Sequence, residues 1–63
     1  MKQIQAVTLS RFNLMRSEDA VEPEQVYEIT NSHGDFRFGW SPDGIGVYWY
    51  PNLNELIAEH GEV

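Results

Sequence analysis

Residues 26–50 of the chain read VYEITNSHGDFRFGWSPDGIGVYWY, and this stretch decides the fold. It contains seven of the eight aromatic residues and two turn sequences, NSHG at 31–34 and SPDG at 41–44. Apolar segments separated by turns rich in Gly, Pro and Asn are typical of antiparallel hairpins. We therefore predict a three-stranded antiparallel meander over residues 26–50.

The SPDG turn predicts how the second and third strands pair. Pro42 presets φ for the first central position, and Gly44 takes a positive φ without strain. A three-residue hairpin loop of this kind pairs Phe38 with Tyr48. This register keeps the aromatic side chains of both strands on one face of the sheet.

The NSHG turn is less specific, and we interpret it as a four-residue loop that pairs Glu28 with Arg37. Because strand side chains alternate between faces, the two registers predict the composition of each face. One face is aromatic and uncharged, with Tyr27, Ile29, Phe36, Phe38, Trp40, Tyr48 and Tyr50. The other face is mixed, with Val26, Glu28, Thr30, Arg37, Gly39, Ile45, Val47 and Trp49.

The clearest helix signal covers residues 52–60. Asn52 is a good N-cap, and Gly61 is a natural stop just past the end. Apolar residues follow the i, i+3, i+4 spacing of an amphipathic helix, at Leu53, Leu56 and Ile57. We expect this helix to pack across the aromatic face of the sheet.

The first 25 residues are less decided. β-branched residues favour a strand over residues 3–9, whereas residues 10–16 stay open, with a short helix as the alternative. Residues 17–25 (SEDAVEPEQ) predict a loop, or one helical turn capped by Ser17, because Pro23 disfavours a longer helix. The predicted fold class is α+β in a single domain, residues 1–63. It is a small antiparallel sheet, with the N-terminal strand as an optional fourth, packed against a C-terminal helix.

Charge is the strongest clue to function. Ten acidic residues against four basic ones give a net charge of −6. All ten acids lie after residue 16, where Arg37 is the only base, which argues against direct binding to nucleic acid or anionic membranes. A basic protein is the partner that this charge favours. The candidate partner-binding acids are Glu18, Asp19, Glu22, Glu24, Glu55, Glu59 and Glu62.

No residue pattern indicates catalysis. The chain has no Cys, and its only histidines, His33 and His60, lack metal-binding spacing. It also lacks a Gly-rich phosphate loop, so we expect no metal, no cofactor and no enzymatic activity. The longest uncharged apolar run, residues 45–50, is too short to span a bilayer, and we expect a cytoplasmic protein.

The mixed face supplies a second candidate site, with Arg37 and Trp49 as its anchors. Residues 2–16 would cover this face in one interpretation. In another, Arg37 stacks on Trp49 and pairs with Glu28 at the surface. If the face is uncovered, it suits a partner or dimer interface, where Trp and Arg are common anchors.

In size, lack of Cys, compact α+β pattern and acidic clusters, the chain resembles the small acidic anti-CRISPR proteins of phages and mobile elements. Some of those proteins look like DNA mimics. The resemblance implies a monomeric, non-enzymatic inhibitor that binds a basic nucleic-acid-binding complex, a type I surveillance complex above all, and blocks DNA engagement. The alternative is an adaptor or homodimeric interaction domain that uses the face of Ile45, Val47 and Trp49.

Overall fold

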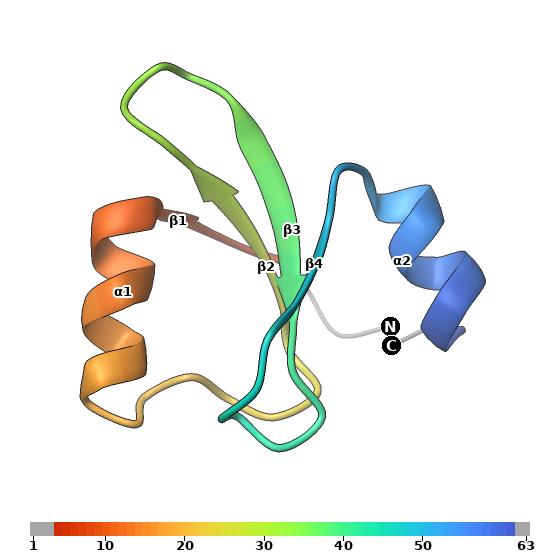
Figure 1. The fold of residues 1–63 in the computed structure, drawn as a ribbon, viewed down its shortest axis with the longest axis horizontal. Coiled ribbons are helices and arrows are strands. Elements are labelled where there is room, and N and C mark those ends of the chain that lie inside the picture. The colour runs from red at the N-terminus through yellow and green to blue at the C-terminus, as the bar shows by residue number, and fades with distance from the viewer. Residues whose placement is uncertain (1–3, 62–63) are drawn as a thin grey trace.

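A computed structural model describes residues 4–61 and shows an α+β fold. The elements are β1 (Gln5–Thr8), α1 (Leu9–Ser17), β2 (Val26–Thr30), β3 (Phe36–Trp40), β4 (Tyr48–Tyr50) and α2 (Leu53–His60). The strands form one sheet in the order β1-β2-β3-β4. α1 and α2 lie on opposite faces of this sheet, and β4 forms the edge nearest the viewer (Figure 1). The predicted class is therefore confirmed, with one helix more than expected.

The N-terminal segment resolves into a strand followed directly by a helix. β1 pairs with β2 in parallel, so the sheet is mixed rather than wholly antiparallel. A parallel pair needs a long crossover connection, and residues 9–25 supply it with α1. Thr8 caps α1 by accepting a hydrogen bond from the Arg11 amide at 3.1 Å. Ser17 ends this helix, and its hydroxyl donates to the Leu14 carbonyl at 2.8 Å, so a helical turn capped by Ser17 was the wrong alternative.

The first hairpin has a register one residue away from the predicted one. Glu28 pairs with Phe38, and Arg37 pairs with Ile29. The cause is a five-residue loop at 31–35, which the Asn31 side chain holds by accepting from the amides of His33 and Asp35 at 2.9 and 3.1 Å. Because a one-residue slip exchanges faces, residues of β2 lie on the face opposite to the predicted one. Tyr27 and Ile29 share a face with Arg37, Gly39 and Trp49.

The second hairpin is shifted by two residues, so that Phe38 pairs with Tyr50 instead of Tyr48. A shift of two preserves the faces, and the aromatic residues of β3 and β4 stay together as predicted. The three-residue turn was wrong because residues 41–47 form a longer loop between the two strands. The Ser41 carbonyl accepts from the Glu24 amide at 2.7 Å, outside the strand ladder. The positive φ of Gly44, 79°, is confirmed.

Each helix encloses its own apolar cluster. On the α1 face the buried residues are Phe12, Met15, Val21, Tyr27 and Ile29. On the α2 face they are Val26, Phe38, Tyr50 and Leu56. α2 therefore covers the aromatic side of β3 and β4, as predicted. Its N-cap is Asn52, whose side chain accepts from the Glu55 amide at 2.9 Å, and Gly61 follows its last residue.

Candidate protein-interaction surface

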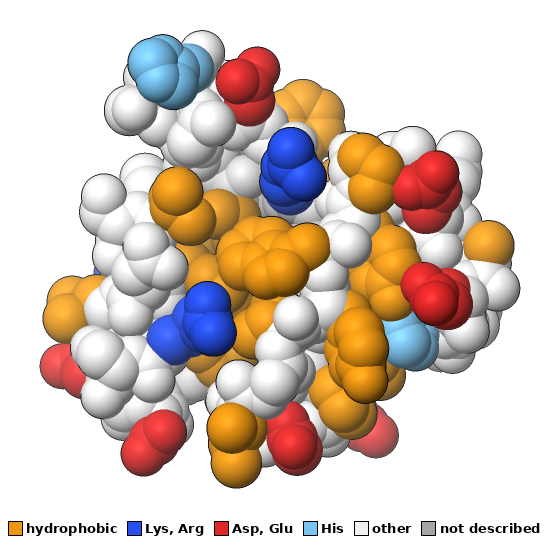
Figure 2. All heavy atoms as spheres, viewed as in Figure 1, with side chains coloured by type: hydrophobic (Ala, Val, Ile, Leu, Met, Phe, Trp, Pro, Cys, Tyr) orange, Lys and Arg blue, Asp and Glu red, His pale blue; other side chains and the backbone are white. Residues whose placement is uncertain are grey.

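The edge strand β4 carries an exposed apolar surface. Ile45 is 76% exposed, Tyr48 53% and Trp49 39%, and we name these three residues the Trp49 surface. Figure 2 views the molecule with this edge facing the reader. Hydrophobic side chains gather at the centre of the view, with basic side chains beside them. Neither helix passes in front of β4 (Figure 1). The Trp49 surface shares Ile45 and Trp49 with the predicted alternative site of Ile45, Val47 and Trp49, but Val47 is half-buried and Tyr48 points to the opposite, aromatic face of the sheet.

Packing beneath the Trp49 indole holds it in place. Its ring meets Phe12 of α1 edge-on, with the ring centroids 5.5 Å apart. Gly39 lies opposite Trp49 on β3, and a Cβ at Gly39 would come within 2.9 Å of Ile29 Cδ1 and 3.3 Å of Val47 Cγ1. Residues 9–17 thus cover this face in part, as one interpretation of the sequence held. The exposed part of the indole is anchored rather than free to turn.

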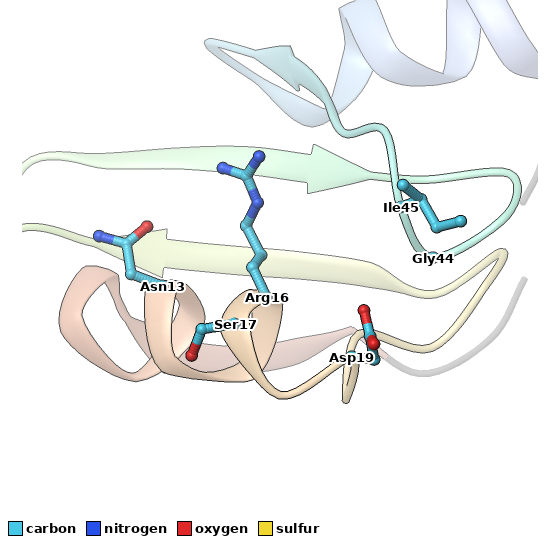
Figure 3. Close-up of a pocket in the computed structure, with 6 residues that line it drawn as sticks. All are labelled: Asn13, Arg16, Ser17, Asp19, Gly44 and Ile45. Atoms are coloured by element: carbon cyan, nitrogen blue, oxygen red, sulfur yellow. The ribbon is translucent and has the colours of Figure 1, made fainter.

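Two arginines lie beside the Trp49 surface. Because Gly39 is opposite Trp49, Arg37 stands diagonally from Trp49 on the same face, a separation of about 7–8 Å that a long side chain spans. Arg16 projects from α1 into a hollow that Ile45 also lines. Figure 3 shows the Arg16 side chain extending away from α1 towards the strands. The surface is therefore apolar at its centre, and its border carries these two arginines together with Asp19, which lines the same hollow as Arg16.

Neither arginine forms an ion pair with any residue between 4 and 61. The predicted pair between Arg37 and Glu28 is wrong, because the observed register places them on opposite faces of the sheet. Two unpaired guanidinium groups beside exposed apolar side chains are notable in a chain of net charge −6. Such groups are typical anchors for a binding partner.

The hollow itself has a volume of about 380 Å³ and is open to solvent. It is lined by Asn13, Arg16, Ser17, Asp19, Gly44 and Ile45. Among the described residues, no histidine or aromatic side chain lines it, and the Ser17 hydroxyl already donates to the Leu14 carbonyl within α1. The arrangement offers charge and shape to a partner rather than a nucleophile with a general base.

The loop 41–47 that carries Ile45 is held by Asp43. The Asp43 carboxylate accepts from the amides of Ile45 and Gly46 at 2.9 and 3.2 Å, and from the Ser41 hydroxyl at 3.2 Å. The two backbone hydrogen bonds lower the pKa of Asp43 below its usual value of 3.8. This network fixes the direction in which Ile45 projects.

The predicted acidic residues do not form one surface. Glu18, Asp19, Glu22 and Glu24 are exposed on the connection between α1 and β2. Glu55 and Glu59 are exposed on α2, which lies on the opposite face of the sheet from α1 (Figure 1). Glu62 lies outside the described residues. The two clusters are therefore separate candidates rather than a single site.

Sequence reasoning missed an aromatic cluster around His60. The imidazole lies against Trp40, Tyr48 and Tyr50, and its Nε2 forms a hydrogen bond with the Tyr50 hydroxyl. Burial raises the pKa of Tyr50 to about 12, and the neighbouring Glu59 carboxylate adds to the shift. The position of His60 seven residues after Leu53 was the available signal, since it ends the apolar stripe of α2.

Within residues 4–61, no group of three or more His, Cys, Asp or Glu side chains could hold a metal ion. No helix in that range is long and apolar enough to cross a membrane. No protein-family model, curated protein or solved structure matches the chain. Function is therefore inferred from the surface of the molecule alone.

Proposed function

We propose that this chain is a small, non-catalytic protein-interaction domain that binds its partner through the Trp49 surface. One observation carries the proposal: Tyr48 and Trp49 stay exposed on the two faces of the edge strand β4, and Ile45 is exposed in the loop before it, although both helices bury apolar residues nearby. Exposed edge strands invite pairing with another chain. Aromatic and arginine side chains are also the commonest anchors of protein interfaces.

Site-specific cross-linking tests this function. We would place the photo-cross-linker p-benzoylphenylalanine at Ile45 and, as a control, at Ser10, which is exposed on α1. A single partner captured at Ile45 and absent at Ser10 is the expected result in the cytoplasm, where we propose that the domain acts. Equal capture at both positions, or none at either, would contradict the proposal.

A matched pair of substitutions separates specific binding from general stickiness. Ile45→Ser removes an exposed apolar side chain from the Trp49 surface, and Leu14→Ser removes one from α1, where Leu14 is 47% exposed. We expect Ile45→Ser to abolish cross-linking from a probe at Tyr48, and Leu14→Ser to leave it intact. Both variants should keep the wild-type circular dichroism spectrum, since neither side chain belongs to the buried clusters.

The acidic side of α2 favours a second candidate function. Glu55 and Glu59 are both exposed one helical turn apart, and the net charge of −6 suits a basic partner. In this version the chain is an anti-CRISPR-like inhibitor that occupies the phosphate-binding residues of a nucleic-acid-binding complex. Its affinity would fall steeply with salt, because exposed charges are screened within about 10 Å at 0.1 M ionic strength. Glu55→Lys combined with Glu59→Lys would abolish such binding, whereas Ile45→Ser would not.

A further inference from the structure

The two edges of the sheet differ in what they offer to another chain. β1 forms one edge, and its exposed residues Gln5, Ala6 and Thr8 are small or polar. β4 forms the other edge and presents Tyr48 and Trp49 on its two faces. A partner strand added to β4 would gain backbone hydrogen bonds and aromatic contacts at once. The edge at β4 is therefore the better platform for strand addition.

The basic side chains lie towards the two ends of this edge. Arg16 shares its hollow with Ile45, before β4 begins. Arg37 lies at the other end, because it precedes Phe38 on β3, and Phe38 pairs with Tyr50, the last residue of β4. Pro51 is six positions after Ile45, which is at most about 20 Å of extended chain. An extended segment with carboxylates at both ends and apolar side chains between them matches this spacing.

We propose that the partner presents an acidic extended segment that adds to β4 as a fifth strand. Its apolar side chains cover Tyr48 and Trp49, and its terminal carboxylates bind Arg16 and Arg37. The inference rests on the proposed function and specifies its partner. Local charge favours an acidic occupant, because both arginines lack an ion pair among residues 4–61, and this holds for Arg16 even though Asp19 lines the same hollow.

Synthetic peptides test the charge requirement directly. Three fluorescein-labelled nonapeptides share the core Thr-Val-Tyr-Val-Thr and carry two Glu, two Ser or two Lys residues at each end. We expect fluorescence anisotropy to show the Glu-flanked peptide binding about three- to tenfold more tightly than the Ser-flanked one, with the Lys-flanked peptide weakest. An analogue of the Glu-flanked peptide with N-methylated core amides should lose binding, because it cannot extend the ladder.

Charge-reversal variants locate the effect on the protein. Arg37→Glu should remove the preference for the Glu-flanked peptide, and Arg16→Glu with Arg37→Glu should reverse it in favour of the Lys-flanked one. Arg11→Glu is the matched control, because it makes the same change in net charge on α1 outside the hollow. It should keep the wild-type order of affinities. The same loss of preference in Arg11→Glu would overturn the inference.

Other outcomes also decide the matter. Equal affinity for the three peptides, or no binding of any of them, would overturn the inference that the partner presents an acidic segment. Tighter binding of labelled oligothymidine than of the Glu-flanked peptide would also overturn it. A concentration-dependent dimer in analytical ultracentrifugation that is lost in Ile45→Ser would overturn it as well, because a second copy of the chain would then be the occupant. If the peptides fail while cross-linking at Ile45 still captures one partner, the interaction domain stands and only its occupant is wrong. If both fail, the proposed function falls too.

Discussion

The imidazole of His60 stacks on the indole of Trp40, with ring centroids 4.2 Å apart and ring planes inclined by 33°. This contact joins the last residue of α2 to the last residue of β3. The hydrogen bond between His60 and Tyr50 adds a second attachment to the edge strand. α2 is therefore held at its C-terminal end by an aromatic contact as well as at Leu56 by the apolar cluster.

His60→Ala should lower the free energy of unfolding by about 1–3 kcal/mol, because it removes the stacking partner of Trp40 and the bond to Tyr50. Urea unfolding followed by circular dichroism measures the change. His33→Ala is the control, since His33 is exposed in the 31–35 loop and should change stability by less than about 0.5 kcal/mol. Equal losses in the two variants would show that the stacking contributes nothing.

Gly39→Ala should destabilise the domain by about 1–3 kcal/mol, because the new Cβ would lie 2.9 Å from Ile29 Cδ1 in a packed region. Gly46→Ala is the matched control, since a Cβ at Gly46 meets no atom within 4 Å. Thermal unfolding of the two variants compares them directly. A Gly39→Ala variant as stable as the wild type would mean that the Ile29 and Val47 side chains can move away from Gly39 without cost.

Gly44→Ala and Gly34→Ala test a contact between loops. Both glycines have positive φ, 79° and 86°, so both substitutions carry a backbone cost of about 1–2 kcal/mol. Only at Gly44 would the Cβ also meet backbone, the Val21 carbonyl oxygen at 2.6 Å. We expect Gly44→Ala to lose at least about 1 kcal/mol more than Gly34→Ala in urea unfolding. Equal losses would indicate that the 41–47 loop can move away from residue 21.

Alkaline unfolding should depend on Tyr50. Its pKa is raised from 10.0 to about 12 in the folded chain, so between these values the unfolded chain loses a proton that the folded chain keeps. The stabilisation is complete below about pH 10 and is lost as the pH rises towards about 12. Urea midpoints measured from pH 9 to 12 should fall less steeply in Tyr50→Phe than in the wild type. Tyr48→Phe, which leaves the Tyr50 hydroxyl in place and removes only the smallest contribution to its raised pKa, should keep most of the wild-type slope.

Much of the local structure could be predicted because it depends on neighbouring residues. Asn52 caps α2 with its own side chain, and Gly61 follows the last turn with a φ of 78°. The strands β2, β3 and β4 lie within the predicted meander. The helix α1 was harder to predict, since only Phe12 and Met15 of its nine residues are buried and the apolar periodicity is correspondingly weak.

The candidate site was predictable only in part. Trp49 and Arg37 were recognised as a possible pair of anchors from their residue types. That Arg16 lies beside them could not be predicted, because Arg16 reaches this face only through the crossover that places α1 over the sheet. The cluster around His60 was missed for a similar reason, since it unites β3, β4 and the end of α2.

By itself the sequence determined where the turns fall, where α2 begins and ends, and which class of fold results. These features follow from side chains that bond to backbone within a few residues. The register of the first hairpin is also local, because Asn31 accepts from the amides of His33 and Asp35 and so closes the five-residue loop. The tertiary structure decided the register of the second hairpin, where the Ser41 carbonyl bonds to Glu24, seventeen residues earlier in the chain. It also decided which side chains each helix buries, because the two apolar clusters join residues that lie far apart in the sequence.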